Sequence, residues 1–260
     1  MNQTQHQDTE LIDASRRKYA AATGAVTAEV HPSDHIFNWL LTNPVFDSPD
    51  SAVAYYFNDG KKSAHKVKRL IERFAVDSER PRLLEFASGY GCVSRHLLNA
   101  IPQLDLTSCD IHPEAIAFLK QNIPGTSQLQ SEHKPGDFAP GPNYDYVFAL
   151  SFFSHMPRAT WSVWLGRLYA AVKPGGFLAF TTQGEGSRQY HGDPTVPDDG
   201  FWFSAQSEQV DLDVNEYGQT IVTPSFVVPE IAAIDSARLV GLDLRGWWEH
   251  QDLYVVRKER

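Results

Sequence analysis

Residues that could bind a nucleotide-like ligand are concentrated in one stretch near residue 90. A short apolar strand ends at Glu85, and Gly89 and Gly91 form a turn that leads into a helical pattern. Such a turn lets a ligand approach backbone N–H groups because no side chain blocks it. Asp110 closes the next apolar run, 19 residues after Gly91, near the spacing at which an acid binds ribose hydroxyls. The pattern predicts a nucleotide-type site with Asp110 as the ribose ligand.

The same stretch disfavours two common nucleotide motifs. A phosphate-binding P-loop ends in Gly-Lys-Ser or Gly-Lys-Thr, and no such ending follows Gly91. The dinucleotide fingerprint requires a third glycine, and this chain has Ser94 in that place. The turn therefore favours another adenosine-containing ligand.

At this point the chain resembles the class I S-adenosylmethionine (SAM)-dependent methyltransferases. Four segments are similar to motifs of that family, in the family's order: E-F-A-S-G-Y-G, L-T-S-C-D-I-H-P-E-A-I, N-Y-D-Y-V-F-A-L-S-F-F-S-H-M-P and V-K-P-G-G-F-L-A-F-T-T. Ala87 replaces the family's first glycine, which is a mild departure because alanine adds only a methyl group. The resemblance implies an α/β fold with a Rossmann-like, doubly wound, seven-stranded, mostly parallel sheet, an antiparallel edge strand, an N-terminal helical segment and a lid insertion.

The resemblance also implies that the cofactor is SAM. The residues expected to bind it lie at the ends of the predicted strands and in the glycine turn: Glu85, Ala87, Ser88, Gly89, Gly91, Asp110, Ile111, Glu132 and Ser151. Ligands of open parallel sheets bind beyond the carboxyl ends of the strands, where Glu85, Asp110 and Ser151 are expected to converge. For the adenine amino group, Glu132, His133 and Asp137 compete, and spacing favours Glu132.

Methyl transfer from a sulfonium is an in-line displacement with a neutral leaving group, so alignment and exclusion of water are the main tasks. A hydroxyl acceptor also benefits from a general base, for which histidine is the usual choice. His155 follows the predicted fourth strand and is the leading candidate, although a histidine there can also simply order the loop. His191 and His250 are alternatives.

The chain is expected to have four parts. Residues 1–60 form a tail, disordered to about residue 10, and a helical cap; residues 61–182 form the SAM-binding core; residues 183–227 form a lid that determines the acceptor; and residues 228–260 add a helix and an edge hairpin. A helix is predicted over residues 61–74, directly after Gly60. One face of this helix is basic, and the simplest interpretation is a solvent-exposed surface. Five residues are expected to contact the acceptor: Tyr55, Tyr56, His191, Trp202 and Tyr217.

Composition narrows the choice of partners. The net charge is −9, from 23 basic and 32 acidic residues, which disfavours nonspecific binding to nucleic acid or anionic membranes. The sequence contains no run of about 18 apolar residues, and its first residues are polar, so neither a membrane span nor a signal peptide is expected. Cys92 and Cys109 are expected to be buried thiols, as fits the cytoplasm. No metal site is expected, since Pro32 interrupts any helix that would align His31 with His35.

The sequence therefore predicts a SAM-dependent methyltransferase that acts on a small-molecule or sugar-like metabolite. The alternative is a SAM-binding or dinucleotide-binding module that serves a partner complex without transferring methyl groups.

Overall fold

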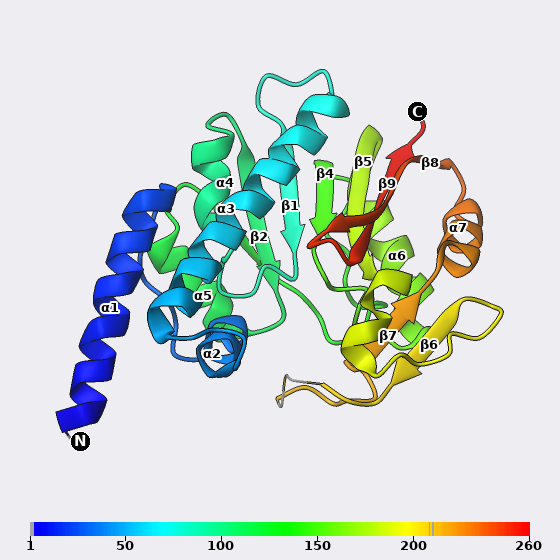
Figure 1. Ribbon diagram of the computed structural model, residues 1–260. Coiled ribbons are helices and arrows are strands. Elements are labelled where there is room, and N and C mark those ends of the chain that lie inside the picture. Colours follow the sequence, from blue (N-terminus) through cyan, green and yellow to red (C-terminus); the bar gives the residue numbers. More distant parts are fainter. Residues whose placement is uncertain (1–2, 208, 210) are drawn as a thin grey trace. The chain divides into compact units, whose positions relative to one another are not determined.

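The computed structural model describes residues 3–207, 209 and 211–260, the side chains of residues 3–8 excepted (Figure 1). The chain divides into two compact units. Unit 1 consists of Met1–Arg80 and Ser88–Gln130, and unit 2 consists of Pro81–Ala87 and Ser131–Arg260.

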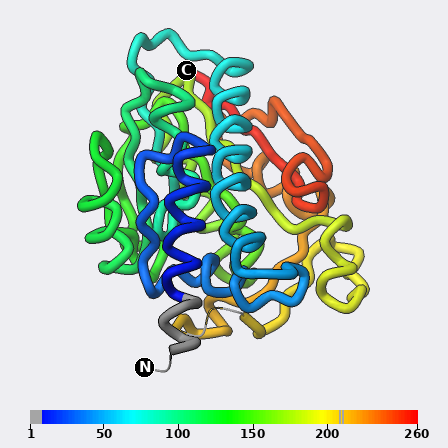
Figure 2. Tube along the Cα trace, turned by 60° about the vertical axis from the view of Figure 1, so that its left-hand side comes forward, coloured from blue at the N-terminus to red at the C-terminus, as the bar shows by residue number. Residues whose placement is uncertain are grey.

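Unit 1 is mainly helical and contains one pair of strands. Its elements are α1 (Gln3–Thr23), α2 (His35–Thr42), α3 (Pro49–Arg73), α4 (Ser94–Ala100), β2 (Asp105–Asp110), α5 (Pro113–Asn122) and β3 (Ser127–Gln130). The strands β2 and β3 are parallel, with Cys109 opposite Leu129. Helix α1 lies beside α3, as both views of the chain show (Figure 2).

Helix α3 begins at Pro49, well before the predicted start at residue 61. Ser48 caps it, since its side chain accepts a hydrogen bond from the N–H of Ser51 and the Ser51 side chain meets the cap backbone. Gly60 lies inside the helix, where an added Cβ would fall 2.1 Å from the carbonyl oxygen of Cys92. The glycine that seemed to mark a boundary therefore permits close packing of α3 on α4, and the predicted division at residue 60 cuts through a helix.

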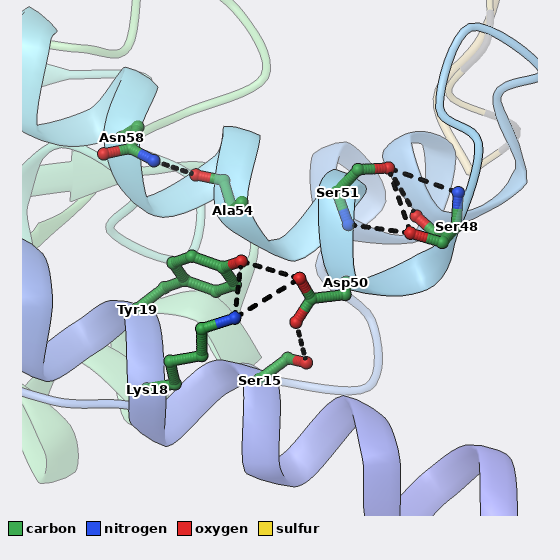
Figure 3. A network of polar contacts seen from close by, with 8 residues as sticks. All are labelled: Ser15, Lys18, Tyr19, Ser48, Asp50, Ser51, Ala54 and Asn58. Atoms are coloured by element: carbon green, nitrogen blue, oxygen red, sulfur yellow. Dashed lines mark hydrogen bonds and ion pairs between the residues drawn. The ribbon is translucent and has the colours of Figure 1, made fainter.

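The N-terminal segment is also more ordered than expected. The prediction of disorder over residues 1–10 is wrong for residues 3–10, which belong to α1, while residues 1 and 2 lie outside the described residues. Asp50, in the first turn of α3, fastens α1 to that helix (Figure 3). Its carboxylate accepts hydrogen bonds from Ser15 and Tyr19, each at 2.6 Å. These bonds, with Lys18 nearby, lower the pKa of Asp50.

Unit 2 holds most of the sheet. Its elements are β1 (Arg82–Phe86), β4 (Tyr144–Ala149), α6 (Arg158–Ala171), β5 (Val172–Gln183), the 3-10 helix η1 (Glu185–His191), β6 (Phe201–Ser204), β7 (Gln219–Val222), α7 (Pro224–Ala232), β8 (Ala237–Trp247) and β9 (Gln251–Lys258). Strands β1, β4 and β5 are parallel neighbours. The C-terminal strand β9 (Figure 1, red) is antiparallel to both β5 and β8.

The predicted fold class is confirmed: the chain is mixed α/β with a mostly parallel sheet and antiparallel strands at the edge. The described residues form nine strands where seven were expected. The insertion after β5 supplies the additional strands, since β6 and β7 form an antiparallel pair and β7 joins β5 where Gln183 faces Ile221. The C-terminal helix covers residues 224–232 and so begins before the predicted C-terminal part, residues 228–260.

Aromatic packing makes a large part of the core of unit 2. Phe86 at the end of β1 contacts Phe152 and Trp164 with ring centroids 4.8 Å and 5.4 Å away. Such buried rings supply much of the hydrophobic free energy of a domain. Among the described helices, none combines the length and the apolar character that crossing a bilayer requires.

Candidate functional site

The glycine turn in unit 1 is held against the end of β2. The φ angles of Gly89 and Gly91 are +53° and +78°, in the left-handed region that favours glycine. The N–H of Ser88 donates to the carbonyl oxygen of Cys109 at 2.9 Å. The N–H of Gly89 donates to Oδ2 of Asp110 at 2.8 Å. The structure thus brings together four of the predicted cofactor residues, Ser88, Gly89, Gly91 and Asp110.

The carboxylate of Asp110 is buried and oriented by a residue that the sequence did not single out. Its Oδ1 accepts hydrogen bonds from the backbone N–H of His112 at 3.1 Å and from Nδ1 of the same ring at 2.8 Å. Two carboxylate oxygens offer about four acceptor positions, and three of them are used, so Asp110 keeps about one position, on Oδ2, for a ribose hydroxyl. Ile111, the next residue, is partly exposed beside it.

Arg95 is a second residue that sequence reasoning missed. It is fully buried. Its Nε donates to the carbonyl oxygen of Gly91 at 2.9 Å, and Nη1 donates to that of Glu29 at 2.9 Å. A buried guanidinium is stable only when its donors are paired, so Arg95 connects the N-terminal segment to the glycine turn within unit 1. Its position, four residues after Gly91 on a short helix, was the available signal.

The two tyrosines predicted to contact the acceptor have different environments. Tyr56 is 1% exposed and its hydroxyl donates to Oδ2 of Asp34 at 2.7 Å. Burial raises the pKa of the Tyr56 hydroxyl well above 10. Tyr56 is therefore packed in the core of unit 1, and its acceptor contact stays a prediction. Tyr55 is 44% exposed, and its role stays a prediction.

The cofactor residues predicted in unit 2 lie at the ends of β1 and β4. These strands are paired through Phe86 and Ala149, so buried Glu85 and partly exposed Ser151 lie at one edge of the sheet. Glu132 is exposed, in the loop before β4. Ala87 has a φ of +56°. A left-handed conformation costs a non-glycine residue about 1–2 kcal/mol, so the departure from glycine is less mild than the sequence suggested.

A polar network fixes Ser151 and includes two residues that were not predicted. The N–H of Ser151 donates to Oγ1 of Thr181 at 2.8 Å. Gln251 donates from Nε2 to Oγ of Ser151 at 2.9 Å and accepts from Thr181 at 2.7 Å. The carboxyl ends of β4 and β5 are thus joined to the start of β9.

The predicted base, His155, is 6% exposed and is held by the insertion. Its Nδ1 lies 2.9 Å from the carbonyl oxygen of Gly218, and its ring stacks on Tyr217 with centroids 4.3 Å apart and an interplanar angle of 6°. A carbonyl oxygen only accepts, so Nδ1 carries the proton, and in the neutral ring Nε2 carries the lone pair. The N–H of Thr220 also donates to the carbonyl oxygen of Ser154 at 2.8 Å. The insertion is therefore fastened to the loop after β4.

His250 and the predicted acceptor contacts His191 and Trp202 lie in another part of unit 2. The His250 ring lies between Tyr190 and Trp248, with centroid distances of 4.9 Å and 6.2 Å. Its Nδ1 lies 3.0 Å from Oγ of Ser187. The rings of His191 and Trp202 are 6.3 Å apart. Burial and then the nearby His191 lower the pKa of His250.

Comparison with known proteins relates part of the chain to methyltransferases. Residues 84–178 match a family described as a methyltransferase domain. The chain is 25% identical over 135 residues to a malonyl-[acyl-carrier protein] O-methyltransferase of Halalkalibacterium halodurans, covering 48% of each protein. It is 28% identical over 151 residues to the biotin biosynthesis bifunctional protein BioCD of Bordetella avium, covering 55% of this chain and 31% of that protein. The chain thus spans at most about half the length of these relatives.

A solved structure shows the same fold. SAM-bound CalS10, an amino pentose methyltransferase from Micromonospora echinaspora, superposes with a TM-score of 0.53 at 16% identity. The alignment covers 76% of this chain and 90% of CalS10.

Proposed function

We propose that this chain, which belongs to the class I SAM-dependent methyltransferases, binds SAM and transfers its methyl group to a small-molecule acceptor. The observation that carries the proposal is the bond from the Gly89 N–H to Asp110 inside the matched domain. It sets a turn with the partly exposed Gly89 beside an oriented carboxylate, which is the arrangement that suits an adenosine ligand.

The proposed roles follow from the chemistry of each residue. The carboxylate of Asp110 accepts a ribose hydroxyl, and Ser88, Gly89 and Gly91 provide the backbone against which the methionine portion lies. In unit 2, Glu85, Ala87, Glu132 and Ser151 are the proposed cofactor contacts. SAM supplies an electrophilic methyl group when bound, and the protein aligns the acceptor with it and excludes water.

The acceptor determines whether a base is needed. A carboxylate acceptor, as the name of the Halalkalibacterium relative suggests, is already an anion and needs none. A hydroxyl acceptor must lose a proton, and the candidate bases are His155 and its alternative His250, in each of which an oxygen atom holds Nδ1 and leaves Nε2 as the basic atom. If His155 is the base, His155→Gln lowers turnover by 10²-fold or more and leaves SAM affinity unchanged. Equal turnover of the variant would assign His155 to the loop alone.

The donor site is tested by calorimetry with SAM and with NAD. Binding of SAM and not NAD is expected, and binding of NAD alone would overturn the assignment. Asp110→Asn removes the charge that the ribose hydroxyl bonds to, so SAM affinity falls by about 10-fold to 100-fold, since bonds to charged groups contribute about 1.5–3 kcal/mol. The control is Asp105→Asn at the opposite end of β2, which leaves SAM affinity unchanged.

Two glycine variants separate binding from folding. Around Gly89, an added Cβ meets nothing within 4 Å, so Gly89→Ala causes no clash and puts a methyl group into the proposed ligand space, and its φ of +53° costs alanine only about 1–2 kcal/mol. At Gly91 a Cβ would fall 2.5 Å from Ile123 and 2.7 Å from Leu119. Gly89→Ala is therefore expected to weaken SAM binding most, and Gly91→Ala to lower stability most.

An enzyme is distinguished from a SAM-binding module by incubating the protein with SAM and cell extract. Formation of S-adenosylhomocysteine shows that methyl transfer takes place.

A further inference from the structure

A group of aromatic rings surrounds His250 in unit 2. We call it the aromatic platform: Tyr190, His191, Trp202, Trp248 and His250. The residues come from η1, from β6 and from the turn between β8 and β9. Tyr190 is 64% exposed and the other four are partly exposed. Exposed rings gathered in this way mark a surface for binding rather than a core.

The turn that carries Trp248 and His250 is held in a strained form. Trp248 and Glu249 have φ angles of +49° and +61°, and residues in such regions cost about 1–3 kcal/mol each and persist only where the surroundings hold them. Trp247 is fully buried and lies 5.3 Å from the ring of Phe148. One anchored ring thus fixes the backbone that presents its neighbours to solvent, and strain of this kind is common at ligand sites.

Ser187 determines which nitrogen of the His250 ring carries the proton. Its hydroxyl lies 2.9 Å from the carbonyl oxygen of His250 and 3.0 Å from Nδ1 of the same residue. The carbonyl oxygen only accepts, so the hydroxyl proton goes to it, and Nδ1–H donates to Oγ. In the described part of the chain Nε2 has no hydrogen-bond partner. The lowered pKa of His250 keeps this nitrogen unprotonated at neutral pH.

The platform is connected to the edge of the sheet where the cofactor residues of unit 2 lie. Gln251 follows His250 in the chain and donates to Oγ of Ser151 at 2.9 Å. Ser151 lies two residues beyond Ala149, at the carboxyl end of the strand pair β1 and β4. In open α/β sheets this edge is where ligands bind.

We propose that the aromatic platform binds the methyl acceptor as a planar aromatic ring with a hydroxyl group, and that Nε2 of His250 accepts the hydroxyl proton. The inference rests on the proposed methyltransferase function. In the step, the O–H bond breaks and its proton moves to Nε2. An oxygen lone pair forms the O–C bond while the S–C bond of the sulfonium breaks, and the electron pair of that bond stays on sulfur. The products are a methyl ether, neutral S-adenosylhomocysteine and an imidazolium that loses its proton to water.

The acidity of the acceptor favours an aromatic hydroxyl. A base with a lowered pKa removes protons efficiently only from comparatively acidic groups. Phenolic hydroxyls ionise near pH 10, whereas sugar hydroxyls are much weaker acids. A flat ring can also stack on an exposed aromatic side chain such as Tyr190, and an aromatic pair contributes about 0.5–1.5 kcal/mol.

The test uses 2-naphthol as the aromatic probe and methyl glucoside as the sugar probe. The full chain is saturated with S-adenosylhomocysteine, and binding of each probe is measured by calorimetry. We expect 2-naphthol to bind at least 10-fold more tightly than methyl glucoside. Tyr190→Ala should weaken 2-naphthol by about 5-fold to 10-fold, the equivalent of one aromatic contact. Trp39→Ala, which removes a half-exposed ring from α2, is the matched control and should change nothing.

Turnover then tests His250 itself. With SAM and 2-naphthol, His250→Gln should form S-adenosylhomocysteine at least 10²-fold more slowly than the parent chain while binding SAM equally. Equal turnover of the variant, absence of 2-naphthol binding, or a bound probe that the parent chain does not methylate would each overturn the inference. Loss of SAM binding by the parent chain would instead overturn the proposed function, so the two failures are distinguishable.

Discussion

The two histidine sites of unit 2 share one arrangement and differ in their surroundings. In each, Nδ1 is held by an oxygen atom, from the carbonyl of Gly218 for His155 and from the hydroxyl of Ser187 for His250. His155 is 6% exposed and stacked on Tyr217. His250 is partly exposed between two aromatic rings. Both histidines thus have the same tautomer, but His155 is buried against the insertion and His250 lies at the surface.

The difference teaches that tautomer and accessibility are separate requirements for a base. A histidine whose Nδ1 is bound is oriented, but a base must also come within hydrogen-bond reach of its substrate. Packing against Tyr217 gives His155 a role in attaching the insertion to the loop after β4. Substitutions around His155 should therefore mainly change stability, whereas substitutions around His250 should mainly change turnover.

The largest effect is expected from Gly184→Ala, which disturbs the packing of η1 against Asp252 beside the His250 site. An added Cβ at Gly184 would lie 2.0 Å from Oδ2 of Asp252, a residue only 3% exposed that also accepts the N–H of Arg245 at 2.8 Å. Overpacking of this kind costs about 1–3 kcal/mol, and it moves η1 away from the β8–β9 turn. The midpoint temperature of thermal unfolding and the turnover rate with 2-naphthol should both fall.

Gly166→Ala provides the control for that variant. Gly166 lies within α6, and an added Cβ meets nothing within 4 Å. Alanine in a helix interior gains about 0.5–1 kcal/mol over glycine, so this variant should be slightly more stable and equally active. If Gly184→Ala behaved in the same way, the close packing of η1 on Asp252 would have no importance for the site.

Ser187→Ala should produce the next largest effect, and on turnover alone. Without the hydroxyl, Nδ1 of His250 loses its acceptor, and the two neutral tautomers compete for the ring. We expect kcat for 2-naphthol to fall about 10-fold, equivalent to about 1.4 kcal/mol, with little change in KM. Ser187→Thr retains a hydroxyl and should restore part of the rate. A variant that raised KM alone would indicate that Ser187 shapes the surface instead.

The sequence predicted the donor side well because its determinants are local. Strand end, glycine turn and the acid that follows lie within about 25 residues, and each depends on backbone geometry that the residue types themselves impose. Gly89 and Asp110 are indeed hydrogen-bonded. The confirmed fold class follows from the same alternation of strands and helices.

The acceptor side was harder to predict because its contacts join distant parts of the chain. Ser187 and His250 are 63 residues apart, as are His155 and Gly218, and no periodic pattern connects such pairs. The surroundings of Tyr56 were hard to predict for a related reason. Gly60 resembled a boundary, yet it lies within a helix that starts at the Ser48 cap and turns Tyr56 toward Asp34.

Tyr217→Leu tests the His155 side, with a smaller effect than the variants above. The stacked pair contributes about 0.5–1.5 kcal/mol beyond its buried area, so the free energy of unfolding should fall by about 1 kcal/mol in a denaturant titration. Turnover with 2-naphthol should stay within about twofold, because leucine keeps the joint filled and the His250 site is untouched. A large loss of turnover at unchanged stability would instead place Tyr217 in the acceptor site.

The smallest effect is a displacement of the pH profile, and it separates the two histidines without a stability change. Burial and His191 lower the pKa of His250 below 6.5, and Tyr190 on η1 is the other titratable ring that contacts it. A base must be unprotonated, so kcat/KM for 2-naphthol should stay constant as pH falls to 6.5 and decline only below it. His191→Gln removes the second positive charge that forms in acid, which raises the pKa of His250 and moves the decline toward higher pH. His155→Gln should leave the decline where it is, and a shift of the profile in that variant would transfer the role of base back to His155.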